Sequence, residues 1–297
     1  MSQTPVPLRP KAKRSMNWKK PAPAEKVRRP PLRERLTHLR GRPGLRQTAL
    51  ALALCVLAGC YAAMPPQSAA TAVVASKRVL PVYSVEREDD VIAVTFDASW
   101  GAENTPKLLD ILDEYDAKCT FFLVGLWVDK YPEMVQAIVE RGHEIGNHSD
   151  THPHMTQISR EKMLRELRMM SDKVEKLTTV RPNLFRPPYG DYNNQVIQVA
   201  RDAGYEAVQW SVDSLDWKNI SPEDMIRRAG KVEKGDIILF HNDSQYLLDA
   251  LPTLLKHYQE QGLKMVKISD ILLEGETTID VQGKQHPIAA KDTTKER

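Results

Sequence analysis

Two histidines, His148 and His152, are four positions apart in a polar stretch that follows an apolar run ending at Ile145. A helical turn or a tight loop can aim both imidazole rings at one point, which is a common way for a chain to hold a divalent metal ion. Taken alone, the pair fits an ordinary solvated loop equally well. The residues around it must therefore decide between the two interpretations.

Other residue types suited to catalysis occur where apolar, β-branched runs give way to polar sequence. They comprise carboxylates, an arginine, a tryptophan and a further histidine: Asp97, Arg186, Asp213, Asp216, Trp217 and His241. Each has a structural alternative, since Asp97 could cap a helix, Arg186 could form a core ion pair and His241 could be a buried histidine. Their joint occurrence at successive strand ends instead favours a single site.

The elements that must position these residues alternate from about residue 88 onwards. Strands are expected at seven β-branched runs, which are Val91–Phe96, Cys119–Gly125, Glu144–Asn147, Leu184–Arg186, Ala207–Val212, Asp236–Phe240 and Met265–Ile268. Helices are expected between them, at Thr105–Tyr115, Asp129–Arg141, Ser159–Leu177, Asn193–Ala203, Ser221–Val232 and Tyr246–Gln261. This alternation predicts an α/β fold, a distorted, incomplete (β/α) barrel of about seven parallel strands, with an open doubly wound sheet as the alternative. In such a barrel the catalytic side chains gather at the carboxyl ends of the strands.

The charged residues are divided unevenly along the 297 residues of the chain. Residues 1–46 hold 14 Lys and Arg against 2 Asp and Glu, together with eight prolines, whereas the rest holds 28 basic and 37 acidic residues. The first segment cannot bury enough apolar surface to offset its ordering entropy, so we expect a disordered basic tail. Because the rest is acidic, we do not expect it to bind nucleic acid, which requires a basic face.

An uncharged, apolar segment separates the tail from the rest, since no charge occurs from Gln47 to Ser76. Residues 47–64 are at the short end of the length range for a membrane-spanning helix. Positive residues precede this segment and do not follow it directly, which orients the N-terminus inward. We expect a single-pass bacterial membrane anchor with the following domain outside the cell, or alternatively a signal whose lipobox-like end makes Cys60 the attachment point of a lipoprotein. We further expect a linker at residues 65–87, a catalytic domain at 88–275 and a flexible C-terminal tail at 276–297.

The strand-end residues fall into five short motifs: Thr95-Phe96-Asp97, His148-Ser149-Asp150-Thr151-His152, Arg186-Pro187-Pro188-Tyr189-Gly190, Asp213-Ser214-Leu215-Asp216-Trp217 and Leu239-Phe240-His241. In order and spacing they resemble the motifs of the polysaccharide deacetylase family, the NodB homology domain of carbohydrate esterase family four. The resemblance extends from about Asp90 to Leu273. It implies a distorted (β/α) barrel and a hydrolase that uses a divalent metal, zinc or cobalt, to remove acetyl groups from N-acetylated sugars.

For the proton transfers, the resemblance implies that Asp97 is the general base and that Arg186 orients it. His241 is then the general acid, and a motif carboxylate tunes it, Asp216 in preference to Asp213. The assignment agrees with ordinary chemistry, because imidazole is suited to donating a proton near neutral pH.

For the metal and the substrate, the resemblance implies that His148 and His152 are metal ligands. A bound metal polarises the amide carbonyl and lowers the pKa of its water. The backbone amide of Tyr189 would help to hold the oxyanion. Pro188 and Trp217 would contribute to the substrate-binding wall, with Trp217 against the acetyl group.

The first motif departs from the family pattern at Ala98. The family has a second aspartate at this position, which is the third metal ligand, and a methyl group cannot ligate. The stretch from Phe96 to Gly101 instead resembles the sporulation-type branch of the family, in which the same replacement occurs. Two ligands remain, so we expect weaker metal binding, with waters or a nearby group completing the shell. Glu103 is the nearest candidate, although an acid in the first turn of the following helix is the favoured interpretation of this residue, and Asp150 and His154 are weaker candidates.

Three functions follow, from different classes. The first is an N-deacetylase outside the cell that acts on amino sugars of a cell-wall glycan, most plausibly peptidoglycan. The second is a glycan-binding pseudoenzyme with the same cleft, which the replacement at Ala98 favours. The third is a membrane scaffold whose basic tail binds a cytoplasmic partner or anionic lipid. Retention of both a candidate base and a candidate acid favours the first.

Overall fold

The computed structural model describes residues 44, 47–48, 50–56 and 78–288. The chain divides into two units, one before and one after residue 74, and the described residues of the first are helical. No helix within the described ranges is long and apolar enough to cross a membrane. The predicted apolar segment at 47–64 lies partly outside those ranges. The basic tail lies outside them apart from Gly44, and so do Cys60 and most of the linker.

The second unit is built on one sheet of short strands whose pairings are all parallel. Its strands run in the order β6–β5–β4–β3–β2–β8–β7, and β9 also pairs with β2. Their bounds are β2 (Val91–Ala98), β3 (Thr120–Leu123), β4 (Glu144–Asn147), β5 (Leu184–Phe185), β6 (Glu206–Ala207), β7 (Val212–Asp213), β8 (Ile237–His241) and β9 (Lys264–Met265). The predicted α/β class is confirmed.

The sheet is curled, because its two edge strands are close neighbours in sequence. In a flat sheet, seven strands at about 4.8 Å spacing would place β6 and β7 about 29 Å apart. The five steps from Ala207 to Val212 can span at most about 18 Å. The edges must therefore approach each other, as in an incomplete barrel. The predicted single strand at Ala207–Val212 was wrong, since it is two strands on opposite edges.

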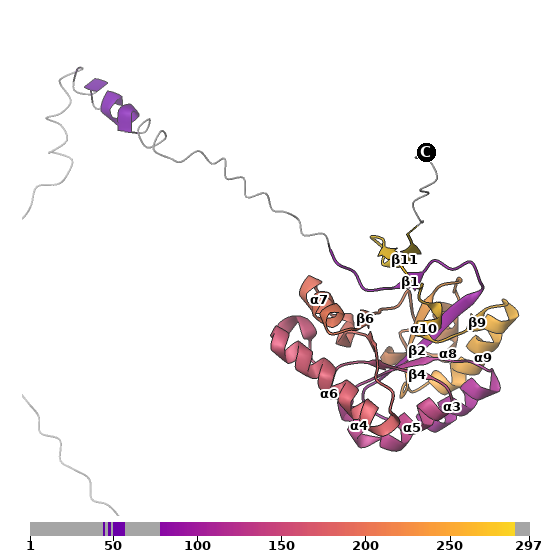
Figure 1. Cartoon of the computed structure of the whole chain (residues 1–297). Coiled ribbons are helices and arrows are strands. Elements are labelled where there is room, and N and C mark those ends of the chain that lie inside the picture. The colour runs from indigo at the N-terminus through magenta and orange to yellow at the C-terminus, as the bar shows by residue number, and fades with distance from the viewer. Residues whose placement is uncertain (1–43, 45–46, 49, 57–77, 289–297) are drawn as a thin grey trace, which may run out of the picture. The chain divides into compact units, whose positions relative to one another are not determined.

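Helices connect successive strands of this sheet except β6 and β7 (Figure 1). Their bounds are α3 (Thr105–Glu114), α4 (Gly125–Lys130), α5 (Pro132–Glu140), α6 (Arg160–Thr178), α7 (Asn194–Asp202), α8 (Pro222–Ala229), α9 (Leu247–Glu260) and α10 (Ile268–Ile271). The predicted caps form at Ser159 and Ser221, whose side chains accept the N–H groups of Lys162 and Asp224. The predicted helix at 129–141 is α5 with the end of α4, because Pro132 disfavours helical backbone at Tyr131.

Strand β2 is buried along its whole length, and its side chains alternate between two faces. The even-numbered residues join the large core cluster under the helices: Ile92, Val94, Phe96 and Ala98. Val91 and Ala93 belong to a different cluster on the opposite face. By this alternation Asp97 points to the face opposite Ala98, which matters for the site described below.

The ends of the second unit form another, smaller sheet in the order β1–β11–β10. Strand β1 (Ser84–Val85) pairs with β11 (Lys284–Pro287), and β11 pairs with β10 (Thr277–Ile279). In Figure 1, β1 and β11 lie together on the side of this unit away from α4 and α5. The predicted flexible tail at 276–297 was therefore wrong for residues 277–287, which form the antiparallel pair β10 and β11. The predicted linker at 65–87 was wrong for Ser84–Val85, which form β1.

Candidate active site

A cleft of about 720 Å³ opens among loops that follow the carboxyl ends of the strands. It is lined by Asp97, Ser99, Trp100, His148, His152, Tyr189, Gly190, Trp210, Asp213, Trp217, Asn219, Leu239, His241, Asp243 and Ser244. The cleft thus brings residues of all five sequence motifs together. Arg186 and Asp216 are fully buried behind the cleft wall, where Arg186 contacts Asp97 and Asp216 contacts His241.

Asp97 is held by a buried ion pair. Arg186 Nη1 donates to Asp97 Oδ1 at 2.7 Å and to the hydroxyl of Thr95 at 2.9 Å. Arg186 Nη2 donates to the carbonyl of Gln209 at 3.0 Å, and the guanidinium carbon lies 4.0 Å from the ring centre of Phe122. Burial is the largest single influence on the pKa of Asp97 and raises it, but the charge and hydrogen bond of Arg186, together with the charges of His148 and His241, outweigh burial, so the pKa lies below its ordinary value. Asp97 is therefore an ionised carboxylate with one oxygen committed to Arg186.

His241 is held by the second buried carboxylate, Asp216. The imidazole Nδ1–H donates to Asp216 Oδ1 at 2.8 Å, and the backbone N–H of His241 donates to Asp216 Oδ2 at 2.7 Å. Burial lowers the pKa of His241, but the hydrogen bond and charge of Asp216, together with the charges of Asp97 and Asp213, outweigh burial, so the pKa lies above its ordinary value. Asp213 instead accepts the N–H of Leu215 at 2.9 Å, which closes a local turn. The geometry therefore selects Asp216 as the partner.

The side chains of Asp97 and His241 are neighbours because of the register between their strands. Asp97 and His241 are paired positions at the carboxyl ends of β2 and β8. In parallel strands, paired residues point to the same face of the sheet. An ionised carboxylate and an imidazole of raised pKa thus stand side by side, which suits a base and an acid that act on one substrate.

The two motif histidines converge on one point. His148 Nδ1 donates to the carbonyl of Arg186 at 2.7 Å, which leaves the lone pair of His148 Nε2 free to ligate. His148 Nε2 and His152 Nε2 are 3.3 Å apart. Two nitrogen ligands of a tetrahedral zinc are about 3.3–3.4 Å apart, so the pair fits a shared metal ion.

The state of charge of the histidine pair agrees with metal binding. Burial is the largest cause that lowers the pKa of His148, and burial lowers that of His152 to about 4. Both rings are therefore neutral at physiological pH, as ligation requires. Asp97 Oδ2 is the carboxylate oxygen nearest to His148 Nε2, at 3.5 Å.

The structure does not bring a third ligand to the pair. In residues 78–288 and the described helical pieces, no group of three or more His, Cys, Asp or Glu is arranged to hold a metal. Glu103, the candidate third ligand, is exposed, does not line the cleft and accepts the N–H of Ala102. Asp150 pairs with Lys173, and His154 stacks on Tyr189 with ring centres 4.2 Å apart. Among the described residues, the donor set at this point is therefore two histidines.

Aromatic side chains form the rim of the cleft. Tyr189 and Trp217, both expected there, are 60% and 55% exposed. Tyr189 has left-handed backbone at φ 60°, and its ring lies against the ring of His152. Pro188, also expected to contact substrate, is buried and does not line the cleft. Its role is therefore to shape the turn that carries Tyr189.

Sequence reasoning missed Trp100, Trp210 and Asp243 among the lining residues. Trp100 is 67% exposed, although the backbone of its neighbour Gly101 is anchored. The carbonyl of Gly101 accepts hydrogen bonds from the side chains of Trp127 and Asn242, and its N–H donates to the carboxylate of Asp243. An exposed tryptophan on an anchored loop is typical of a ligand-binding surface. The available signal was its place directly after the strand that ends at Ala98.

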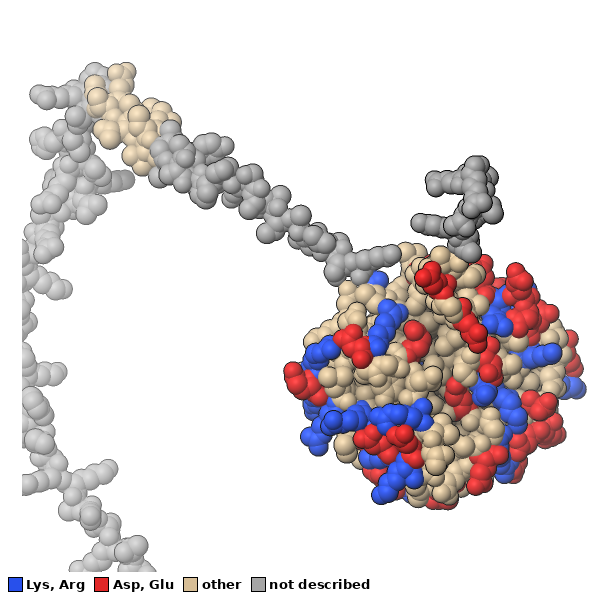
Figure 2. All heavy atoms as spheres, in the orientation of Figure 1, with Lys and Arg blue, Asp and Glu red and all other residues tan. Residues whose placement is uncertain are grey.

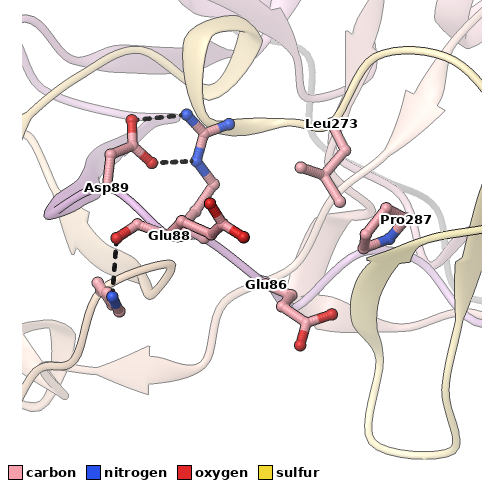
Figure 3. A pocket seen from close by; sticks show the side chains of 7 residues that line it. Glu86, Glu88, Asp89, Leu273 and Pro287 are labelled. Carbon is pink, nitrogen blue, oxygen red and sulfur yellow. Dashed lines mark hydrogen bonds and ion pairs between the residues drawn. The ribbon is translucent and has the colours of Figure 1, made fainter. Parts of the chain in front are cut away.

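A second hollow is lined by Glu86, Glu88, Asp89, Leu273 and Pro287 (Figure 3). Its cations have partners, because Arg87 pairs with Asp89 at 2.7 Å and Lys234 donates to the carbonyl of Glu88 at 2.8 Å. None of the motif residues lines it. It is therefore not the catalytic site.

Positive and negative side chains are interspersed on the face of the catalytic unit shown in Figure 2. This face thus lacks the continuous basic surface that nucleic-acid binding requires. The observation agrees with the excess of acidic residues after residue 46.

Comparison with known proteins agrees with the geometry. A family model described as polysaccharide deacetylase matches residues 84–208. A peptidoglycan-N-acetylglucosamine deacetylase of Bacillus cereus is 36% identical over 196 residues, which are 64% of this chain and 92% of that protein.

Solved structures include both active and inactive relatives. A family 4 pseudoenzyme of Bacillus anthracis is 33% identical, with a TM-score of 0.63 over 65% of this chain and 69% of that chain. A mutant of that pseudoenzyme with restored enzymatic activity is 34% identical, with a TM-score of 0.63 over 65% of this chain and 71% of that chain.

Proposed function

This chain belongs to the polysaccharide deacetylase family, and we propose that it is a metal-dependent hydrolase that removes N-acetyl groups from amino sugars of a cell-wall glycan. The predicted enzyme class, a polysaccharide N-deacetylase, is confirmed at the level of the family. The observation that carries the proposal is the register pairing of Asp97 and His241 beside the histidine pair. Peptidoglycan is the substrate we propose, because a relative acts on it.

A divalent metal, zinc or cobalt, held by His148 and His152 would supply Lewis-acid polarisation of the acetamide carbonyl. Asp97 accepts a proton from the water that attacks the carbonyl carbon, since its free oxygen Oδ2 faces the histidines and its other oxygen is held by Arg186. The amide of Tyr189 is proposed to donate to the oxyanion. Arg186 therefore acts through Asp97, as an orienting group.

His241 completes the reaction. Its Nδ1–H is committed to Asp216, so the proton it donates is on Nε2, and the acceptor is the leaving nitrogen of the sugar. The carbon–nitrogen bond breaks, and acetate and a free amino sugar form. Because Asp216 raises the pKa of His241, the imidazole is protonated over a wider range of pH than a free histidine.

The test is acetate release from N-acetylated peptidoglycan by the full chain, with added zinc or cobalt, with a chelator, and with Asp97→Asn. Acetate that requires both metal and Asp97 supports the proposal. Glycan binding without acetate in any condition would refute it.

A second candidate, a glycan-binding pseudoenzyme, is favoured by one observation. The methyl group of Ala98 is buried in the core cluster at the position of the family's third ligand, and no other carboxylate replaces it in the described residues. The exposed aromatic rim serves binding in either case. Trp100→Ala should therefore weaken glycan binding, measured by pull-down with insoluble peptidoglycan, whether or not acetate is released.

For localisation, we propose that residues 47–64 anchor the chain in a bacterial membrane and that the catalytic unit lies outside the cell, with lipid attachment at Cys60 as the alternative. The proposal depends on the uncharged segment and on the basic residues that precede it. Protease treatment of intact spheroplasts should digest the catalytic unit and leave a membrane-bound fragment. Protection of the whole chain would contradict it, and replacement of Cys60 by serine separates the two modes of attachment.

A further inference from the structure

The buried carboxylate of Glu166, on α6, has no part in the proposed reaction. It is only 6% exposed, and both of its oxygens face the loop of residues 148–152. Oε2 accepts the backbone N–H groups of Asp150 at 3.0 Å and Thr151 at 2.7 Å, and Oε1 accepts the hydroxyl of Thr151 at 2.9 Å. Lys173, on the same helix, is paired with Asp129 and Asp150 instead. Glu166 is thus stabilised mainly by backbone amides of one loop.

The backbone of the loop at residues 148–152 is held by hydrogen bonds to side chains rather than by regular secondary structure. Ser149 and His152 are left-handed, with φ of 68° and 57°, a conformation that non-glycine residues seldom adopt. Four consecutive N–H groups, from residue 149 to residue 152, donate to side-chain oxygens rather than to a helix or a strand. Glu166 accepts the two central ones. Without it, the two central N–H groups of the loop would lose their acceptors in a partly buried setting.

The same helix also holds the start of the loop. Asn147 Nδ2 donates to the carbonyl of Leu167 at 2.7 Å and to the hydroxyl of Ser171 at 3.0 Å. The side-chain oxygen of Asn147 in turn accepts the N–H of Ser149 at 2.8 Å. Helix α6 therefore fixes the backbone on both sides of His148, and through Glu166 it fixes the approach to His152.

We propose that Glu166 is a positioning residue that sets metal affinity, because it holds the loop in the form in which the two Nε2 atoms are 3.3 Å apart. The inference rests on the proposed metal-dependent function and adds to it. With two histidines and no third ligand from the described residues, affinity depends strongly on how well those two are pre-arranged. A carboxylate is required rather than an amide, since both oxygens accept.

The test is Glu166→Gln in the full chain, with the zinc dissociation constant measured by competition against a chromophoric chelator. The amide side chain keeps the volume but replaces one acceptor by a donor that faces other donors. Loss of a group that hydrogen-bonds a metal ligand directly lowers metal affinity about 10- to 100-fold. Because Glu166 acts through the backbone of the loop, we expect a loss near the lower end of this range. The midpoint of thermal unfolding, measured in excess chelator, shows whether the substitution destabilises the whole metal-free fold. An unchanged midpoint would therefore assign a loss of zinc affinity to the loop.

The matched control is Glu161→Gln, an exposed acid in the first turn of the same helix that does not contact the loop. It should leave zinc affinity unchanged, and Thr151→Ser, which keeps the hydroxyl, should do the same. Unchanged zinc affinity in a folded Glu166→Gln chain would overturn the proposal.

If Glu166→Gln does not fold, Thr151→Val decides, because it removes only the hydroxyl bond to Oε1. We then expect weaker zinc binding at an unchanged thermal midpoint in chelator, and equal zinc affinity would overturn the proposal. Zinc binding is measured directly in all cases. A chain that binds zinc but releases no acetate would therefore refute the proposed hydrolysis and leave the role of Glu166 intact.

Discussion

The cleft has a proton-transfer half, formed by Asp97 with Arg186 and His241 with Asp216, and a metal half, formed by His148 and His152. In the first half each catalytic group has a buried partner of opposite charge. In the second half the two histidines are pre-arranged, but the third position is the methyl group of Ala98. The comparison shows that one cleft can keep a complete set of candidate acid–base groups with their partners while it has only two of the three metal ligands that the family pattern contains.

The largest expected effect comes from removing the base. Asp97→Asn keeps the shape of the side chain but cannot accept the proton, and acetate release should fall about 10²- to 10⁴-fold. The measurement is the initial rate with saturating zinc. Zinc affinity measured in parallel should change far less than the rate.

A rate for Asp97→Asn equal to that of the unmodified chain would show that the proton-transfer half is not used. Asp270→Asn, at an exposed carboxylate on α10 away from the cleft, is the matched control and should leave the rate unchanged.

The next largest effect should come from restoring the family's ligand with Ala98→Asp. Groups that only orient metal ligands change metal affinity about 10- to 100-fold. A direct ligand should contribute at least as much, so we expect zinc affinity to rise by at least this factor and acetate release to become faster. Position 98 is fully buried in an apolar cluster, so the new carboxylate should lower the thermal midpoint in chelator, and zinc should recover it.

Ala98→Asn is the control for this change, since it adds similar volume without a strong metal ligand. Equal zinc affinity in the aspartate and asparagine variants would mean that position 98 cannot reach the histidines and that the metal half is complete with two ligands.

A smaller effect, a shift in pH dependence, should follow Asp216→Asn. The pKa of His241 is raised by Asp216, so protonated His241 is present at low pH and is lost as pH rises through that pKa. Loss of the Asp216 charge lowers the pKa, and the alkaline limb of the rate profile should move to lower pH. Rate–pH profiles of both chains at saturating zinc measure this.

The reference for the shift is Asp213→Asn, because the carboxylate of Asp213 accepts a backbone N–H and not the imidazole. Its alkaline limb should move less than that of Asp216→Asn. An alkaline limb that stays in place when Asp216 is changed would exclude His241 as the general acid.

The smallest effect is expected from Glu103→Gln. Its carboxylate is exposed and accepts only a neighbouring backbone N–H, so zinc affinity and acetate release should both stay as they are. A large loss of zinc affinity would mean that the loop rearranges on metal binding and that the metal half recruits a carboxylate from outside the cleft.

The local elements and the motif residues were predictable from sequence. Helix starts at Ser159 and Ser221 were predicted correctly because capping depends on neighbouring residues only. The strand at Ala207–Val212 was not, since nothing in its sequence marks the point where the chain leaves one edge of the curled sheet, as β6, and joins the other edge, as β7. The hairpin at the C-terminus was missed for a related reason, because its partner is β1, about two hundred positions earlier.

The sequence by itself determined which chemical groups are present. It supplied a candidate base, a candidate acid, their partners and two candidate metal ligands in one order along the chain, and it placed Ala98 where the family has a third ligand. These are properties of residue type and spacing. They require no knowledge of which strands pair.

Only the tertiary structure decided which groups meet. Asp97 and His241 are neighbours because β2 and β8 pair in register, and Asp216 rather than Asp213 holds the imidazole. Glu166, which no motif marks, lies under the histidine loop because α6 packs there. Such contacts join residues distant in sequence, and they form only when burial of the core fixes the helices and strands against one another.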